Sequence, residues 1–345
     1  MTPARTRGTS RVADVTMSGP GGAFDAEVRL PGDKSLSHRA LLFAAMAEGD
    51  SLLEGLSTGA DVASTALAIT RLGVTVERGH VRSPGIAHWV DPDGPVDCGN
   101  SGTTIRQLAG IISTSQTRAI LVGDASLSRR PMRRLLEPLR GLGGEIELSP
   151  EGTAPIRVGG AIEPRASDHT IPMASAQVRT AFELAALAAG GPSTIDSPPG
   201  FRDHTERWLS AVGRGEWETD TRFRIEPGPL PPARYQIPGD PSSAAFLWAI
   251  AAIHPGSRIT TPEVSLNPGR LGFLQILDQM GVGIEAEVTG ATGGDPVGTV
   301  TVEAKELYGT TVDGTLIAAA LDELPLVAVL GAFAEGITTV RDAAE

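Results

Sequence analysis

The sequence has 345 residues, of which 41% are hydrophobic but only 4% aromatic, and a formal net charge of −12. This length suits about two domains with aliphatic cores, and no apolar run reaches the ~18 residues that a membrane helix needs. The acidic balance argues against a nucleic-acid or membrane-surface partner, and the single cysteine, Cys98, excludes an internal disulfide and fits a reducing, cytoplasmic setting.

The chain begins with MTPARTRGTSRV, which is basic and lacks the apolar segment of a signal peptide, so we expect a loose tail. The first predicted element is a helix within LPGDKSLSHRALLFAAMAEG, residues 30–49. It opens a series of Ala-rich helices that are apolar nearly all round and are therefore expected to be buried. The other members lie within residues 104–124, 181–197, 244–261 and 324–342.

A second series of helices alternates with the first. Each ends in an apolar residue and a glycine before a short strand, and the glycines recur about every 70 residues. Glycine is favoured there because helices often end in a left-handed residue. Charged side chains such as Arg133, Arg134, Glu137 and Arg140 place these helices on the outside. The four glycines are Gly73, Gly143, Gly213 and Gly281.

Strands alternating with helices predict an α/β architecture built from repeated units. Four units are complete, and a fifth begins near residue 322 and stops where its outer helix should start. The Pro- and Gly-rich stretch PGPLPPARYQIPGDPSS, residues 227–243, predicts a junction between the third and fourth units.

Polar clusters precede the Ala-rich helices: PGDKSLSHR, DCGNSGTTIR, MASAQVR and GDPSSAAF. A helix N-terminus offers free N–H groups and suits an anion. Taken singly, Ser35 and Asn100 are interpreted as helix caps, His38 as a surface or structural histidine and Cys98 as a small buried residue. Arg129, Arg133 and Arg134 favour a solvated face. The set as a whole favours an anion site, because capping does not require Lys, Arg or Gln.

Cofactor motifs are not found. A P-loop needs Gly directly before its Lys, but position 33 is Asp. GxGxxG after a strand, HExxH and CxxC do not occur either. Neither a cofactor nor a metal site is therefore predicted.

Seven motifs, in order, resemble those of the 5-enolpyruvylshikimate-3-phosphate (EPSP) synthase family and span about residues 25–345. SAQVRTA is closer to the bacterial form with Ser-Ala-Gln than to the Ser-Ser-Gln form. The motifs are LPGDKSLSHRAL, GNSGTTIRQLAG, SLSRRPMRRLLEPLRGLGG, SAQVRTA, FRDHTERWL, IPGDPSSAAF and DELPLVAVLGAFAEGITTVRDAAE.

The resemblance implies a two-domain inside-out α/β barrel of six βαβαββ units, with buried helices pointing their N-termini at the interdomain cleft. With four and a half units here, we expect a first domain of residues 24–236 and an incomplete second domain of residues 1–23 plus 237–345. The family is usually monomeric, so a monomer is expected, although an incomplete second domain would expose apolar surface and promote association.

The resemblance also implies a transferase of the shikimate pathway, in chorismate and aromatic amino acid biosynthesis. It moves the enolpyruvyl group of phosphoenolpyruvate to the 5-hydroxyl of shikimate 3-phosphate and releases phosphate. Two phosphates and a carboxylate call for Arg, Lys and helix N-termini, and the addition and elimination steps need an acid and a base.

By the same resemblance, Lys34 binds phosphoenolpyruvate and acts in proton transfer, and Asp322 is the base at the 5-hydroxyl, with a helix N-cap as its bland alternative. Asn100, Gly102 and Arg130 hold phosphoenolpyruvate, supported by Thr103 and Arg106. The shikimate 3-phosphate ligands are Ser35, Arg39, Ser175, Ala176 and Arg202, and Gln177 touches both substrates. Gly102 leaves room in the pocket, so we expect a full-length form to be inhibited by glyphosate.

The sequence also departs from the family pattern. The family continues with Lys-Glu-x-x-Arg and later a His-Arg pair and a Lys, which do not occur here. We therefore expect this chain alone to be inactive or poorly active, and a fragment that only binds shikimate 3-phosphate is the alternative. The sister UDP-N-acetylglucosamine enolpyruvyl transferase is disfavoured, because it has Lys-Asn at the first motif and a loop Cys, where this chain has Lys34-Ser35 and GDASLSRRP.

Overall fold

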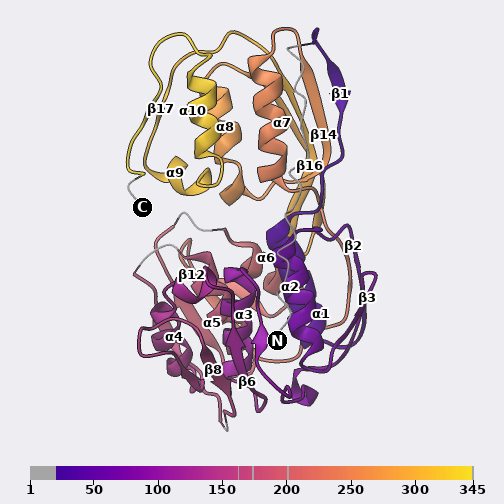
Figure 1. Cartoon of the computed structure of the whole chain (residues 1–345), viewed down its shortest axis with the longest axis vertical. Helices are drawn as coiled ribbons and strands as arrows, with labels where there is room; N and C mark the ends of the chain where they lie inside the picture. Colours follow the sequence, from indigo (N-terminus) through magenta and orange to yellow (C-terminus); the bar gives the residue numbers. More distant parts are fainter. Residues whose placement is uncertain (1–20, 162, 173–174, 200–201, 344–345) are drawn as a thin grey trace, which may run out of the picture.

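Two hydrophobic cores divide the chain into two lobes, stacked along the long axis of the molecule (Figure 1). The computed structural model describes residues 21–161, 163–172, 175–199 and 202–343. The predicted N-terminal tail and almost all of residues 1–23 lie outside them. The lower core runs from Leu36 to Ile237, and the upper core is built from residues 244–330.

The sheets repeat one pattern. Each of the four large sheets has a parallel pair followed by two antiparallel strands, in the orders β13-β2-β4-β3, β5-β6-β8-β7, β9-β10-β12-β11 and β1-β14-β16-β15. A fifth pair, β17-β18, is parallel. The predicted repeat of α/β units is therefore confirmed, with three sheets in the lower lobe.

The strand bounds, in chain order, are β1 Asp25–Glu27, β2 Glu48–Glu54, β3 Thr75–Glu77, β4 His80–Pro84, β5 Val96–Asp97, β6 Arg118–Val122, β7 Ile146–Glu147, β8 Ile156–Gly159 and β9 Asp168–Thr170. They continue with β10 Ser193–Asp196, β11 Gly215–Trp217, β12 Arg222–Ile225, β13 Arg234–Gln236, β14 Arg258–Ser265, β15 Gly283–Thr292, β16 Asp295–Glu303, β17 Thr311–Val312 and β18 Thr339–Val340.

The Ala-rich helices form the inner layer of the lower lobe, where α1 buries every residue from Leu36 to Met46. Full burial was predicted for the whole series and is wrong for α7 and α10, which pack on each other and leave Phe246, Ile250 and Val329 exposed. The lower lobe encloses its helices among three sheets, whereas the described upper lobe has one large sheet. The series comprises α1 Lys34–Met46, α3 Gly102–Ser113, α5 Ala176–Ala186, α7 Pro241–Ile253 and α10 Leu324–Gly331.

The second helix series ends as predicted. Each of its glycines has a positive φ, between 68° at Gly213 and 95° at Gly73, and the charged residues of α4 are exposed. The predicted outside position is wrong for α6, which buries five of its residues, Trp208 among them. This helix packs against α1 of its own lobe and against β16 of the other lobe. This series comprises α2 Ala60–Thr70, α4 Leu136–Gly141, α6 His204–Ala211 and α8 Gly272–Gln279, with the short α9 Thr315–Ala319 before α10.

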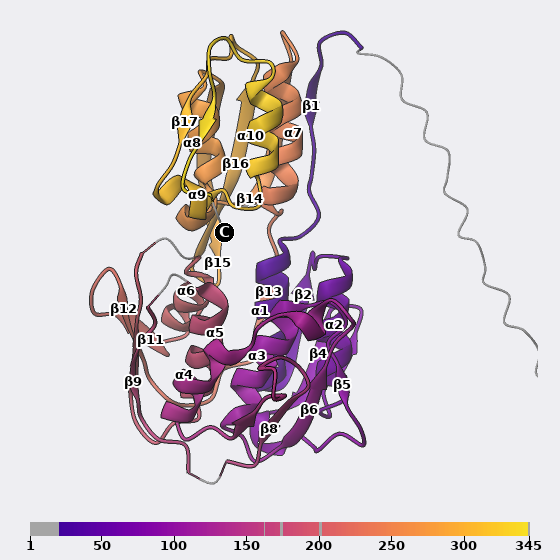
Figure 2. The same ribbon diagram turned by 60° about the vertical axis from the view of Figure 1, so that its left-hand side comes forward.

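The chain crosses between the lobes twice. The crossings pair at Gly32 and Gly239, with Asp33 N–H donating to Pro238 O at 2.7 Å and Asp240 N–H donating to Pro31 O at 3.0 Å. A Cβ on Gly32 would lie 1.8 Å from Gly55 O, so only glycine fits. The segment before the first crossing packs on the upper core and pairs β1 with β14, so residues 24–30 lie in the upper lobe rather than in the expected first domain (Figure 2).

Candidate active site between the lobes

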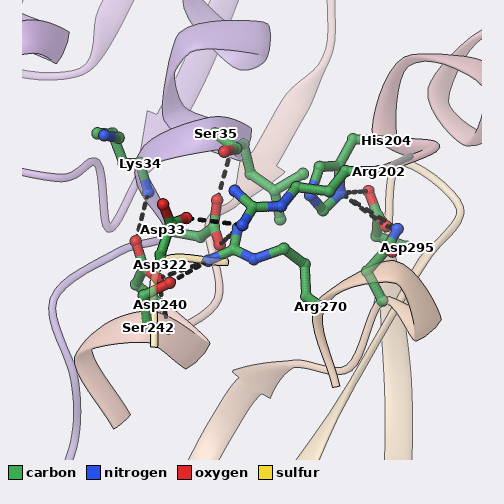
Figure 3. A network of polar contacts seen from close by, with 12 residues as sticks. Asp33, Lys34, Ser35, Arg202, His204, Asp240, Ser242, Arg270, Asp295 and Asp322 are labelled. Atoms are coloured by element: carbon green, nitrogen blue, oxygen red, sulfur yellow. Dashed lines mark hydrogen bonds and ion pairs between the residues drawn. The ribbon is translucent and has the colours of Figure 1, made fainter. Parts of the chain in front are cut away.

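The N-termini of α1 and α7, one from each lobe, meet at the crossing and are capped by Asp33 and Asp240 (Figure 3), and α3 of the lower lobe is capped by Ser101. Asp33 Oδ1 accepts from Leu36 N–H at 2.8 Å, Ser101 Oγ from Thr104 N–H at 3.1 Å, and Asp240 Oδ1 from Ser242 N–H at 2.8 Å. The capping interpretation of Ser35 and Asn100 is therefore wrong. The polar side chains beside these caps are left for other contacts.

One guanidinium joins the crossings (Figure 3). Arg270, from the 3₁₀ turn Pro268–Arg270, donates to Asp33 Oδ2 at 3.2 Å and to Asp240 Oδ1 at 3.1 Å. Burial raises the pKa of Asp33, but Arg270 and His204 outweigh it, and the net pKa lies below the ordinary value. The Asp33 carboxylate is thus held charged inside the protein, and Arg270 bonds it and Asp240 with one guanidinium.

Lys34 and Ser35 begin α1. The Lys34 N–H donates to Asp240 Oδ2 at 3.0 Å, and its ammonium lies 3.8 Å from Asp61 Oδ2 with the side chain half exposed. Ser35 is half-buried, and its carbonyl accepts from Arg39 Nη1 at 3.1 Å. The Lys34 ammonium is therefore free to turn toward a ligand.

Arg39 is one helical turn further in and only 4% exposed. Its Nε donates to Thr205 Oγ1 at 2.8 Å and its Nη2 to Thr180 Oγ1 at 3.0 Å. Burial lowers the pKa of this guanidinium, although nearby carboxylates such as Glu206 oppose the shift. Arg39, which was predicted to bind shikimate 3-phosphate, thus lies beneath Ser35 and connects α1 to α5 and α6.

Arginines gather at the start of α3. Arg106 Nη1 donates to Gln177 Oε1 at 2.7 Å, and Arg130 Nη2 donates to Asn100 Oδ1 at 2.5 Å. Gln177 Nε2 in turn donates to Thr103 Oγ1 at 3.3 Å. These contacts bring together most of the residues predicted for phosphoenolpyruvate.

A cavity of about 140 Å³ lies beside this cluster, lined by Arg106, Arg134, Ser175 and Gln177, among others. Arg134 had been assigned to a solvated face; it is exposed, but it also lines this cavity. Burial, then Arg130 and Arg134, lowers the pKa of Arg106. No carboxylate within the described ranges forms an ion pair with these three arginines, so the cavity holds uncompensated positive charge.

The start of α5 supplies the second edge of this cavity. Ser175 is the residue before the helix and makes no capping hydrogen bond, and Ala176 is the first helical residue. Both are half-buried. Backbone N–H groups at this helix start are therefore available next to the arginines.

Arg202 and Asp322 connect the lobes directly, with Arg202 Nη2 2.6 Å from Asp322 Oδ2. Glu323, not Asp322, is the residue that precedes α10, so the N-cap interpretation of Asp322 is wrong. Burial raises the pKa of Asp322, but Arg202 above all, then Arg270 and Lys34, bring it below the ordinary value. Asp322 is therefore a charged carboxylate facing the positive groups of the lower lobe.

A second cavity lies at the same junction. It has a volume of about 770 Å³ and is lined from the lower lobe by Asp203 and Trp217 and from the upper lobe by Gln275 and Thr315, among others. It shows that a cavity lies between the lobes beside the start of α6.

Sequence reasoning missed a buried polar cluster beside the site. Asp295, at the turn between β15 and β16, is fully buried and accepts from His204 Nδ1 at 3.0 Å, Trp208 Nε1 at 3.1 Å and Asn267 Nδ2 at 2.6 Å. Asp203 also accepts from Asn267 at 2.8 Å. The only signal for this cluster was its adjacency to Arg202, since its members come from distant parts of the sequence.

Two residues keep the structural roles predicted for them. His38 is buried and its Nδ1 lies 2.7 Å from Thr65 Oγ1, and burial, then Lys34 and Arg39, lowers its pKa to about 3. Burial raises the pKa of the Cys98 thiol to about 12, which excludes a thiolate nucleophile.

Among the described residues, no group of three or more His, Cys, Asp and Glu could hold a metal ion. None of the helices in this part of the chain is long and apolar enough to cross a bilayer.

Comparisons with known proteins agree with one another. The model of a family described as EPSP synthase (3-phosphoshikimate 1-carboxyvinyltransferase) matches residues 19–345. A 3-phosphoshikimate 1-carboxyvinyltransferase of Chloroflexus aurantiacus is 43% identical over 328 residues, which are 92% of this chain and 75% of the relative. One of Bacillus velezensis is 39% identical over 329 residues, 94% of this chain and 77% of the relative.

The solved structures give the same result. An EPSP synthase from Acinetobacter baumannii superposes with a TM-score of 0.86 and 36% sequence identity, covering 94% of this chain and 76% of that one. The chain thus spans about three quarters of the length of these relatives.

Proposed function

The chain belongs to the EPSP synthase (3-phosphoshikimate 1-carboxyvinyltransferase) family, and from this premise we propose how its interlobe site carries out the reaction. The reaction transfers the enolpyruvyl group of phosphoenolpyruvate to the 5-hydroxyl of shikimate 3-phosphate and releases phosphate. The observation that carries the proposal is the contact of Arg202 with Asp322, which brings a cation and a carboxylate of the two lobes together at the arginine-rich helix starts.

Phosphoenolpyruvate binds at the start of α3. Its phosphate and carboxylate need several cations, and Arg106, Arg130 and Arg134 offer guanidinium groups whose hydrogen-bond partners, where they have any, are neutral. Guanidinium groups bind such anions in bidentate fashion. Asn100, Gly102 and Thr103 shape the site, and Lys34 approaches from α1.

Shikimate 3-phosphate binds between α1, α5 and the start of α6. Ser35, Ser175 and the N–H of Ala176 offer hydrogen bonds, and Arg202 offers charge for the phosphate. Gln177, held by Arg106 and Thr103, lies between the two substrate positions. Arg39 supports the site from below by fixing Ser35.

Asp322 is the base that removes the proton of the 5-hydroxyl. In the unliganded state Arg202 keeps the pKa of Asp322 low, which makes it a weak base. When the substrate phosphate takes Arg202, this pKa rises and the carboxylate accepts a proton more readily. Lys34 is the acid for the alkene carbon, because its ammonium is half exposed at the start of α1 and can donate a proton.

Titration calorimetry of the 345-residue chain with shikimate 3-phosphate tests the binding half. We expect Arg202→Ala to weaken binding by roughly 10- to 100-fold, since a charge-assisted hydrogen bond contributes about 1.5–3 kcal/mol. The matched control is Arg222→Ala, which removes an exposed arginine paired with Glu218 on the third sheet. Absence of binding by the unmodified chain would contradict the proposal.

Phosphate release from the two substrates tests the chemical half. Whatever release the unmodified chain shows, even if slow, Asp322→Asn should abolish it while shikimate 3-phosphate still binds. If the unmodified chain binds shikimate 3-phosphate without releasing phosphate, the alternative of a binding-only chain is favoured.

The cellular location and the small-molecule partners follow from the same premise. We place the protein in the cytoplasm, as for the family, with phosphoenolpyruvate and shikimate 3-phosphate as its small-molecule partners. The single cysteine is buried and suits a reducing compartment.

A further inference from the structure

The two chain crossings carry one aspartate each, and both carboxylates bond the same arginine. We propose that Arg270 is a positioning residue that fixes how the two lobes meet, by holding the starts of α1 and α7 with the two branches of one guanidinium (Figure 3). In its consequence for substrate binding, this inference rests on the proposed function.

Each of the two terminal nitrogens of the Arg270 guanidinium, which together form a planar fork, contacts a different crossing. Nη1 reaches Asp33 Oδ2 on the first crossing, while Nη2 reaches Asp240 Oδ1 at 3.1 Å and Ser242 Oγ at 2.7 Å beyond the second. Arg270 itself comes from neither crossing, but from the turn that leads into α8. Three segments distant in sequence therefore depend on one planar group.

Arg270 and its two aspartate partners are buried, so solvent cannot replace the positive charge of the guanidinium. The Arg270 side chain is 3% exposed, and those of Asp33 and Asp240 are 0% and 12% exposed. Removing the cation would leave two buried carboxylates close together, each already used as a helix cap. A lysine would keep the charge but could not reproduce this geometry, because its single nitrogen cannot place two separate, coplanar nitrogen atoms on the two carboxylates.

The network reaches proposed substrate groups in both lobes. In the lower lobe, Asp240 Oδ2 accepts from the backbone N–H of Lys34. In the upper lobe, the Ser242 hydroxyl donates to Glu323, the residue next to Asp322. Arg270 thus links the start of α1, which carries the proposed acid, to the segment that carries the proposed base.

The test separates positioning from simple charge compensation. Two variants are compared, Arg270→Lys and Arg270→Gln, in the 345-residue chain. If only charge matters, Arg270→Lys behaves like the unmodified protein. If the fork sets the lobe arrangement, Arg270→Lys resembles Arg270→Gln, with shikimate 3-phosphate affinity lowered roughly tenfold, within the usual range of coupling between sites.

The lobe arrangement can be measured without substrate. Spin labels at Ala63→Cys on α2 and Asp278→Cys on α8 report the interlobe distance by pulsed electron paramagnetic resonance; both positions are exposed, while the native Cys98 is fully buried. We expect both Arg270 variants to shift and broaden the distance distribution, and added shikimate 3-phosphate to narrow it again.

Arg179→Lys is the matched control. Arg179 is equally buried, but its bonds to Glu206 at 2.7 Å and Ser197 at 2.9 Å lie within the lower lobe. This variant should lower the melting temperature without changing the interlobe distribution. A distribution that Arg270→Lys leaves unchanged overturns the inference, whatever the substrate result. A shifted distribution in a protein that binds no shikimate 3-phosphate supports the inference and contradicts the proposed function.

Discussion

At the scale of single residues, Gly102 controls the space beside two arginines. A Cβ there would lie 2.6 Å from Arg106 Nη1 and 3.1 Å from Arg130 Nη1, both ends of flexible side chains. Gly102→Ala should therefore fold normally but displace these guanidiniums, weakening binding of phosphoenolpyruvate and of glyphosate by about tenfold, or roughly 1–2 kcal/mol. Calorimetric titration of phosphoenolpyruvate or glyphosate into the protein already saturated with shikimate 3-phosphate measures both affinities.

Gly94→Ala is the control for this prediction, because a Cβ at Gly94 would meet nothing within 4 Å. It should leave both affinities unchanged. Equal binding by the Gly102→Ala and unmodified chains would show that the two guanidiniums do not contact these ligands.

His38 predicts a pH dependence of stability. Its pKa is about 3 in the folded protein but about 6.5 when unfolded. The unfolded state therefore binds the extra proton between these values, and the free energy of unfolding falls as the pH is lowered from about 6.5, by roughly 1.4 kcal/mol per pH unit. His38→Asn keeps a polar group near Thr65 and should flatten this slope.

Urea unfolding at a series of pH values measures the slope. The exposed His88 provides the control, since His88→Asn should leave the slope as it is. A slope that His38→Asn does not reduce would mean that another group carries the acid sensitivity.

At the scale of elements, the β15–β16 hairpin extends from the upper lobe onto α6. Asp295, the first residue of β16, is fully buried and accepts from three side chains. Asp295→Ala leaves those donors without an acceptor, so we expect the free energy of unfolding to fall by about 3 kcal/mol or more. Denaturant titration checks this against Asp278→Ala, an exposed change on α8 that should stay within about 0.5 kcal/mol. A loss as small as that of the control would exclude the cluster as a brace between the lobes.

The elements themselves were largely predictable from local patterns. The Ala-rich runs and the terminal glycines predicted both helix series, because the requirement for a left-handed residue is local. The position of α6 was not predictable, since its burial depends on a hairpin whose Asp295 lies 87 residues from Trp208 in the sequence. The predicted caps were wrong by one or two residues, because neighbouring polar residues cap equally well. The structure uses Asp33 in place of Ser35, and Ser101 in place of Asn100.

The site shows the same limit. The motifs predicted Arg106, Arg130 and Gln177 as neighbours, and their hydrogen bonds agree. Arg270 and Asp295 lay outside every quoted cluster, because each acts through contacts between distant segments. Sequence motifs therefore predict the groups that face the ligand. They do not predict the network of contacts that fixes the position of one lobe relative to the other.

At the scale of the whole molecule, the upper lobe exposes large apolar side chains on α7 and in the segment that follows α10. Phe246 and Ile250 on α7 are 60% and 49% exposed, and Phe333 and Ile337, just after α10, are 60% and 83% exposed. Apolar surface gathered in this way marks an association site. We therefore expect this chain to self-associate as its concentration rises, in contrast to the monomer that the resemblance implied.

Sedimentation velocity over a range of concentrations tests this expectation. Phe246→Ser combined with Phe333→Ser should restore the mass of a single chain, whereas Leu67→Ser, which removes an isolated exposed side chain on α2, should not. Because apolar association strengthens in sulfate and ionic association weakens with salt, adding ammonium sulfate should increase the mass of the unmodified chain. A single-chain mass at every concentration, with and without sulfate, would instead support the monomer.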